Sequence, residues 1–192
     1  MRQSELKAND VRHFVFPTCF GAMAVAWLPR GRGAGILRVF LPIPGASTME
    51  IVKRSLPESR PGSCEAVEEI AGRIDACLNG SATSFSLSPA LLQVCGAFQR
   101  RVLLAEHGVP RGSVTTYQRL ASHVGQPTAA RAVGMALARN PFPILIPCHR
   151  AIRSDGSLGG FQGGLEMKRA LLAMEGVEFS PDGRVAAPRL HY

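Results

Sequence analysis

The segment from Asn140 to Pro147, NPFPILIP, constrains the fold of this chain more than any other stretch. It places three prolines among apolar residues. Because proline fixes φ and has no amide hydrogen, the segment cannot form a regular helix or a central strand. We expect a fixed, extended, apolar wall that leads directly into Cys148, His149 and Arg150.

The three residues after this segment offer a nucleophile, a base and a permanent cation. A cysteine attacks as its thiolate, and a nearby imidazole or positive charge lowers its pKa. Adjacent helical residues do not face each other, so proton transfer from Cys148 to His149 is expected to need a turn or a bridging water. Glu175, an acid in an otherwise apolar helical stretch, is the candidate that orients the imidazole. A lone Cys–His pair is more often structural, so its neighbours must support this assignment.

The charge of the chain favours a polyanionic partner. Its 192 residues contain 22 Lys and Arg against 14 Asp and Glu, a net charge of +8. Between Arg100 and Arg153 the only acid among the arginines is Glu106. Such a block suits nucleic acid, because each Lys or Arg placed on a phosphate releases counterions. A solvated basic face that binds nothing charged would explain the same block, so charge alone does not decide.

Two short helices are predicted just before the proline-rich segment. Thr115 or Thr116 would cap the first, which carries Tyr117, and Thr128 would cap the second, over residues 129–139. Two helices joined by a tight turn are typical of a helix-turn-helix, whose second helix reads DNA. That second helix is rich in alanine and glycine around Arg131. Such a surface fits close packing on another helix, or the floor of a DNA groove with one arginine reaching into the base stack.

The rest of the chain predicts a two-part α/β plus helical protein with a packed core. Hydrophobic residues make up 46% and charged residues 19% of the chain, which excludes disorder. Residues 1–89 are predicted to form an α/β scaffold domain, and residues 90–192 a mainly helical domain. The expected elements are a hairpin of residues 23–27 and 36–41, a helix over 66–78 that stops at Asn79-Gly80, a short strand over 85–87 and a helix over 91–107.

The sequence predicts a cytosolic protein without a metal site. The first ten residues are polar, and no apolar run approaches the roughly 18 residues of a membrane span. The five cysteines are odd in number and lack a CxxC spacing, which indicates a reducing compartment. Cys19, Cys64 and His13 do not form a convincing ligand set, so neither a metal nor a cofactor is expected.

Residues 140–150, NPFPILIPCHR, closely resemble the active-site segment of the O6-alkylguanine-DNA alkyltransferases, also called methylated-DNA–protein-cysteine methyltransferases. The resemblance extends from about Phe98 to Val177. It includes SVTTY at 113–117, AARAVG at 129–134 and LLAMEG at 171–176. The first 89 residues are similar to the family's N-terminal α/β domain only in length and in their strand-then-helix order.

The resemblance implies a DNA repair protein that works once per molecule. An O6-alkylguanine would be flipped out of duplex DNA, and its alkyl group transferred irreversibly to Cys148. His149 would act through a water as the base, and Glu175 would hold the imidazole. Asn140 would join the recognition helix to the active-site segment, and Arg150 would be a structural ion-pair partner rather than a catalyst.

The resemblance also implies how DNA and the damaged base are bound. The helix-turn-helix would lie in the minor groove, with Arg131 filling the gap left by the flipped base and Tyr117 beside the adjacent phosphate and the extruded guanine. A glycine-rich lid, residues 156–164, carries Phe161 where many members carry tyrosine, which keeps an aromatic wall but removes a hydrogen-bond donor. The implied DNA-binding residues are Thr116, Tyr117, Ala130, Arg131, Ala132 and Gly134, and the implied substrate pocket is Tyr117, Pro143, Ala151, Phe161 and Gln162.

The expected partner is double-stranded DNA, bound by a monomer in the cytoplasm or nucleoid of a prokaryote. Cooperative binding, activity on O4-alkylthymine and the range of alkyl groups stay open. A relative that only flags damage would lack the cysteine, so Cys148 argues against it. A helix-turn-helix regulator with a buried cysteine would bind undamaged DNA. A cysteine hydrolase would need an oxyanion hole, for which no motif is present.

Overall fold

The computed structural model describes residues 10–31, 33–186 and 189–192. Of the ten residues that form the polar start of the sequence, residues 1–9 lie outside these ranges. Within the described ranges, no helix is long and apolar enough to cross a membrane.

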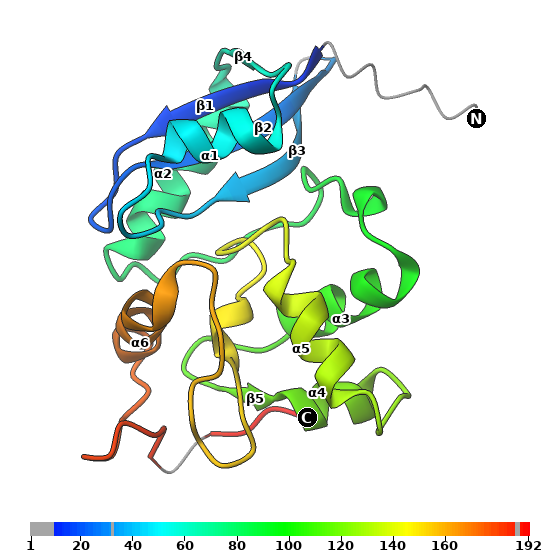
Figure 1. Cartoon of the computed structure of the whole chain (residues 1–192), viewed down its shortest axis with the longest axis vertical. Helices are drawn as coiled ribbons and strands as arrows, with labels where there is room; N and C mark the ends of the chain where they lie inside the picture. The colour runs from blue at the N-terminus through cyan, green and yellow to red at the C-terminus, as the bar shows by residue number, and fades with distance from the viewer. Residues whose placement is uncertain (1–9, 32, 187–188) are drawn as a thin grey trace.

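The N-terminal part is built on a four-stranded mixed sheet with the order β3-β2-β1-β4 (Figure 1). β1 (Arg12–Phe16) and β3 (Gly33–Phe40) pair antiparallel with β2 (Met23–Arg30), whereas β4 (Arg60–Pro61) joins β1 in parallel. The predicted hairpin is thus confirmed as β2 and β3. The sequence did not predict β1 and β4. β4 has only two residues and pairs with β1 far along the chain, whereas β1 has five residues and pairs with the neighbouring β2.

Alternation along β2 explains how two helices cover this sheet. Met23 and Val25 contact the main core, which also contains residues of α2 (Glu65–Leu78). Ala24, from the opposite face, packs with Val52 of α1 (Thr48–Ser55). Successive side chains of a strand point to opposite faces, so one apolar strand serves both layers. The predicted stop of α2 is confirmed, with Asn79 at the C-cap and a left-handed residue, Gly80 (φ 91°), after it.

The connection to the second part follows the outer edge of β3. The Ile36 amide donates to the Pro89 carbonyl at 2.7 Å, and the Leu91 amide donates to the Ile36 carbonyl at 2.8 Å. The strand predicted over residues 85–87 is wrong, since these residues have no regular structure. The helix predicted from residue 91 is also wrong in its first turns. A 3-10 turn, η2 (Leu92–Val94), comes first, and α3 (Ala97–His107) begins only after an extended Cys95.

The second part carries four further elements around a short parallel pair of strands, β5 (Thr115–Thr116) and β6 (Ala151–Ile152). These elements are α4 (Tyr117–His123), α5 (Ala130–Ala138), the 3-10 turn η3 (Cys148–Arg150) and α6 (Gly164–Met174). Thr116 caps α4 as predicted, its hydroxyl accepting from the Arg119 amide at 3.1 Å. Thr128 does not cap α5. Ala129 stands at that position instead, because its amide continues the preceding turn by donating to the Gln126 carbonyl.

One continuous apolar core joins the sheet to the helices. Its buried residues include Trp27 and Ile74 from the N-terminal part and Leu103, Leu120 and Ile146 from the second part. Figure 1 shows the sheet with α1 and α2 stacked against the group formed by α3 to α6. The boundary between residues 89 and 90 therefore stays a prediction.

Candidate active site

The proline-rich segment is a buried turn and not the extended wall predicted for it. The Ile146 amide donates to the Phe142 carbonyl at 2.8 Å, and Ile144 between them has a φ of 73°. A positive φ is unusual for a β-branched residue and marks local strain. The prolines do exclude a helix and a central strand, but they leave a reversal of the chain possible.

The side chain of Asn140 holds this turn together through hydrogen bonds to its backbone. Its side chain is fully buried, its Oδ1 accepts from the Phe142 amide at 2.9 Å, and its Nδ2 donates to the Ile146 carbonyl at 3.1 Å. The neighbouring Pro141 carbonyl accepts a 2.8 Å bond from the Val39 amide of β3. Asn140 is thus the link between α5 and the residues that precede Cys148, and the turn is tied to the edge of the sheet.

Cys148 lies at the start of η3, with 6% of its surface exposed. Burial raises the pKa of its thiol to about 11, while a side-chain hydrogen bond with Asn140 acts in the opposite direction. The thiol is therefore protonated near neutral pH and needs a base before it can attack.

His149 and Glu175 are brought together as predicted. The imidazole Nε2 lies 2.9 Å from Glu175 Oε1, and both side chains are at most 4% exposed. Arg150 completes the group, with Nη2 2.7 Å from Oε1 and Nε 2.9 Å from Oε2. Burial alone would raise the pKa of Glu175, but hydrogen bonds from His149 and Arg150 lower it to about 2. Glu175 is therefore a carboxylate that accepts from both residues.

The ionised Glu175 fixes how the imidazole is used. Because Nε2 donates to the carboxylate, the other ring nitrogen, Nδ1, keeps its lone pair. Nδ1 is buried and has no hydrogen-bond partner among the described residues. Burial lowers the pKa of His149, so the ring is a neutral acceptor at physiological pH.

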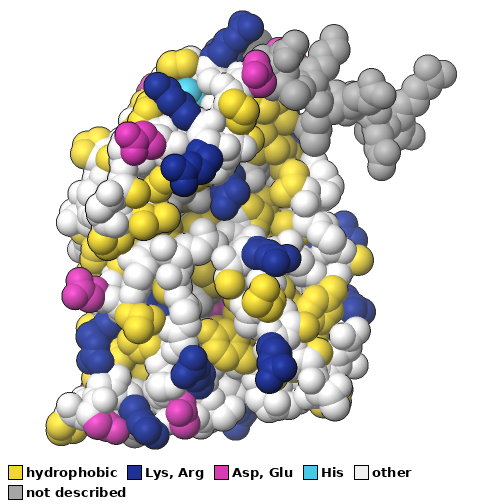
Figure 2. Space-filling view, in the orientation of Figure 1, with side chains coloured by type: hydrophobic (Ala, Val, Ile, Leu, Met, Phe, Trp, Pro, Cys, Tyr) yellow, Lys and Arg dark blue, Asp and Glu magenta, His cyan; other side chains and the backbone are white. Residues whose placement is uncertain are grey.

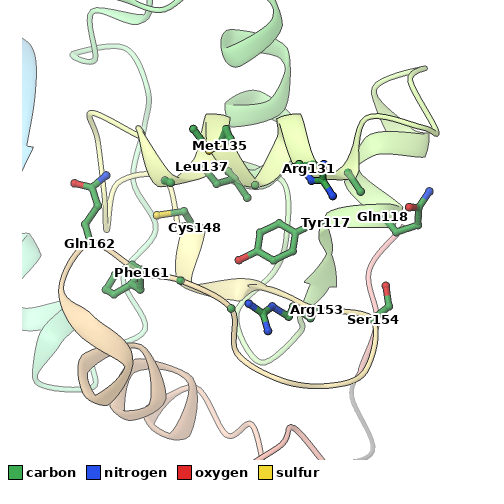
Figure 3. Close-up of a pocket in the computed structure, with 15 residues that line it drawn as sticks. Tyr117, Gln118, Arg131, Met135, Leu137, Cys148, Arg153, Ser154, Phe161 and Gln162 are labelled. Atoms are coloured by element: carbon green, nitrogen blue, oxygen red, sulfur yellow. The ribbon is translucent and has the colours of Figure 1, made fainter.

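A cavity of about 540 Å³ opens in front of Cys148 (Figure 3). It is enclosed by α4, α5 and the loop that follows β6. The sulfur of Cys148 points into it, and the ring of Tyr117 stands in its centre. Burial raises the pKa of Tyr117 to about 12, which keeps the phenol protonated. The sequence-predicted residues that line it are Tyr117, Ala130, Arg131, Gly134, Cys148, Phe161 and Gln162.

Four of the residues predicted to bind DNA or the damaged base do not line this cavity. Pro143 and Ala151 are buried outside the lining of the cavity, and the Ala151 carbonyl accepts from Lys168, so their role as pocket residues stays a prediction. Thr116 is buried as the cap of α4, and Ala132 is exposed on α5 but does not line the cavity. Within the described ranges no cluster of three or more His, Cys, Asp or Glu could hold a metal ion.

Two fully buried charged residues near Cys148, Lys168 and Glu106, were not predicted from the sequence. Lys168 Nζ donates to the carbonyls of Ala151, at 2.6 Å, and Leu158, which holds the chain after Cys148 to the loop around the cavity. Glu106 of α3 has no hydrogen-bond partner for either carboxylate oxygen among the described residues, and burial raises its pKa to about 8. Each occupies an apolar face in the helical pattern, which was the available signal.

Known proteins are similar to the part of the chain that carries this site. Residues 97–177 match the family described as "6-O-methylguanine DNA methyltransferase, DNA binding domain". The methylated-DNA–protein-cysteine methyltransferase of Methanothermobacter thermautotrophicus is 43% identical over 129 residues, covering 67% of this chain and 71% of the relative. That of Mycobacterium leprae is 39% identical over 133 residues, covering 67% and 79%.

Solved structures extend the likeness to most of the chain. The crystal structure of Mycobacterium tuberculosis OGT in complex with DNA has a TM-score of 0.69 and 29% identity, and covers 86% of this chain and 92% of that one. The O6-methylguanine-DNA methyltransferase of Pyrococcus kodakaraensis shares the fold, with a TM-score of 0.65, 24% identity and coverage of 87% and 99%. The extent of the match to the curated relatives, together with the buried Cys148 beside a His149–Glu175 pair, shows that this chain belongs to the methylated-DNA–protein-cysteine methyltransferase family.

Proposed function

We propose that this protein repairs DNA by transferring the alkyl group of O6-alkylguanine to the thiol of Cys148. One observation carries the proposal: Cys148 forms the floor of a cavity, next to a neutral imidazole that a buried carboxylate holds in place. Membership of the family supports the same activity, that of a methylated-DNA–protein-cysteine methyltransferase.

The chemistry follows from the protonation states of these groups. His149 Nδ1 takes the thiol proton through one water, and Glu175 stabilises the imidazolium that forms. The thiolate then attacks the alkyl carbon, so that an S–C bond forms while the bond between that carbon and O6 breaks. The electron pair of the broken bond stays on the guanine, which takes up the proton. The alkyl group cannot leave the thioether formed on Cys148, so each protein molecule reacts once.

Burial of the nucleophile requires the damaged base to leave the helix. A base inside a duplex cannot reach Cys148, a residue that is only 6% exposed at the floor of a cavity, so the nucleotide is flipped out. We propose that α4 and α5 act as a helix-turn-helix in the minor groove, with Arg131 filling the gap in the stack. Figure 2 shows Lys and Arg side chains around apolar surface on the face that carries α5, as contact with phosphates requires.

The experiment that tests the activity is intact-protein mass spectrometry with peptide mapping, after incubation with a duplex that contains one O6-methylguanine. We expect one methyl group on Cys148, saturating at one per molecule. An unmodified protein that still binds the duplex would instead support damage flagging or gene regulation. Repeated turnover without a lasting adduct would support a hydrolase.

The flipping role of Arg131 has a test of its own. Arg131→Ala should slow methyl transfer from a duplex far more than transfer from free O6-methylguanine, because the free base needs no flipping. Arg139→Ala, at the C-cap of the same helix and outside the cavity, is the matched control. Equal losses on both substrates would remove the flipping role.

Three finer features belong to the same proposal. We expect a monomer in solution, in which residues 1–89 serve as a scaffold for the reactive part. O4-alkylthymine is a second candidate substrate, because it also carries an alkyl group on an exocyclic oxygen. Competition between the two damaged bases for a limiting amount of protein would measure the preference.

A further inference from the structure

Arg153 brings a second cation to the cavity, opposite Arg131. It follows β6 directly, and it lines the cavity together with Cys148 and Tyr117. In Figure 3 the guanidinium of Arg153 lies on one side of the Tyr117 ring and Arg131 lies on the other. The described residues that line this cavity include these two arginines and no acid.

Hydrogen bonds fix the backbone of Arg153, whereas its guanidinium has no ion-pair partner among the described residues. Its backbone is fixed in a tight loop, because its amide donates to the Ser157 carbonyl at 2.9 Å and its carbonyl accepts from the Gly156 amide at 3.0 Å. None of the ion pairs between described residues includes Arg153. Asp155, the acid nearest in sequence, accepts from the amide and hydroxyl of Ser157 instead.

Cys148 and Arg153 lie at different depths in the cavity, which indicates where the base and the phosphates of a bound nucleotide would lie. Cys148 is almost completely buried at the floor, whereas Arg153 is exposed at the rim. The alkylated O6 has to reach the sulfur, so the base occupies the floor. The sugar and its phosphates then lie toward the rim, at the depth of Arg153.

We infer that Arg153 binds a phosphate of the extruded nucleotide. This inference rests on the proposed function, since it requires a nucleotide in the cavity. A guanidinium is the side chain best suited to a phosphate, because its planar array of donors can form two parallel hydrogen bonds with it. Arg131 would occupy the space that the base leaves, while Arg153 would hold the base outside the stack. Arg153 would therefore favour damage within a nucleic acid strand over the free base.

The test compares three methyl donors in single-turnover measurements. They are a duplex with one O6-methylguanine, the same duplex with neutral methylphosphonates on both sides of the lesion, and free O6-methylguanine. Arg153→Gln is compared with the wild type and with Arg169→Gln. The control removes the same charge from the exposed face of α6, where Arg169 bonds to the Gly183 carbonyl outside the cavity.

We expect Arg153→Gln to slow transfer from the normal duplex about tenfold, the effect of losing a charge-assisted hydrogen bond. The rate with the methylphosphonate duplex should be the same for variant and wild type, and so should the rate with the free base. The unchanged free-base rate would also show that the variant is folded. Arg169→Gln should match the wild type on all three donors.

Other outcomes would overturn the inference. Equal slowing on the free base would assign Arg153 to the guanine. Slowing that persists with the methylphosphonates, or no slowing at all, would exclude the phosphate contact. If the wild type transferred no methyl group from any donor, the proposed function would fail, and this inference with it.

Discussion

Replacing Glu175 by glutamine should destabilise the protein, because this carboxylate is the shared partner of two buried cationic or hydrogen-bonding groups. Arg150 is 12% exposed, and its guanidinium donates to both carboxylate oxygens, while His149 donates to one of them. A glutamine keeps the shape of the side chain but removes its charge and one acceptor. The variant therefore leaves a buried guanidinium without its counterion, which is a costly change.

The pKa of Glu175 sets the size of the effect. The pKa falls from 4.5 to about 2 in the folded protein, and one pKa unit corresponds to about 1.4 kcal/mol, so the charged form is stabilised by about 3 kcal/mol. A lowered carboxyl pKa contributes stability that is present above the unfolded value of 4.5. That stability is lost as the pH falls from 4.5 through about 2. At neutral pH we expect Glu175→Gln to lose about 3 kcal/mol of unfolding free energy.

Urea denaturation of the wild type and Glu175→Gln at pH 7 and at a series of pH values down to 2 measures both parts of this prediction. The difference between the two proteins should be largest at pH 7 and should shrink below about pH 4.5. Arg73→Gln, which breaks an exposed ion pair with Glu69, is a control that should change stability by less than about 1 kcal/mol. A loss below about 1 kcal/mol for Glu175→Gln, or a difference independent of pH, would refute the reasoning.

Three further predictions concern the same region. Cys148→Ala should abolish methyl transfer and leave binding to alkylated DNA nearly intact, and any residual transfer measured by mass spectrometry would contradict the assignment. Burial raises the pKa of Glu106 to about 8, so the stability that this side chain contributes is lost as the pH rises from 4.5 to 8. In urea unfolding, Glu106→Gln should therefore gain stability relative to the wild type over that range. A difference between the two proteins that does not change with pH would argue against this prediction. Gly159→Ala should slow methyl transfer, because Gly159 has a φ of 67° and an added Cβ would lie 2.5 Å from the Tyr117 hydroxyl; Gly160→Ala, which has open space, should react at the wild-type rate.

Sequence patterns predicted the strands, helices and caps that depend on contacts between residues close together in the chain. The alternation in β2 and β3 and the helical periodicity of α2 carry their own signals, and Thr116 caps α4 through a contact three residues away. Thr128 offered an equally good cap by composition. The turn before α5 places Ala129 at the start of the helix instead, so local preference was overridden.

Long-range contacts decide the features that were missed. The prolines of the active-site segment exclude regular structure but do not say which way the chain turns. That choice depends on the Asn140 amide, which bonds across the turn to Ile146. The burial of Lys168 depends on carbonyls at Ala151 and Leu158, to which no local pattern points. The pairing of His149 with Glu175 was predicted from the resemblance together with one acid in an apolar stretch, and the structure places the two side chains in contact.

The backbone hydrogen bonds along the outer edge of β3 affect how the N-terminal part would behave as a separate fragment. β3 is the last strand of its sheet, and its free edge is covered by Pro89 and Leu91 and by the Pro141 carbonyl of the active-site turn. An uncovered edge strand offers unpaired donors and acceptors to another chain, which is a common origin of aggregation. The reactive segment thus also shields the sheet from self-association. A fragment that ended at residue 89 would lose Leu91 and Pro141, and backbone groups on the edge of β3 would be left unpaired.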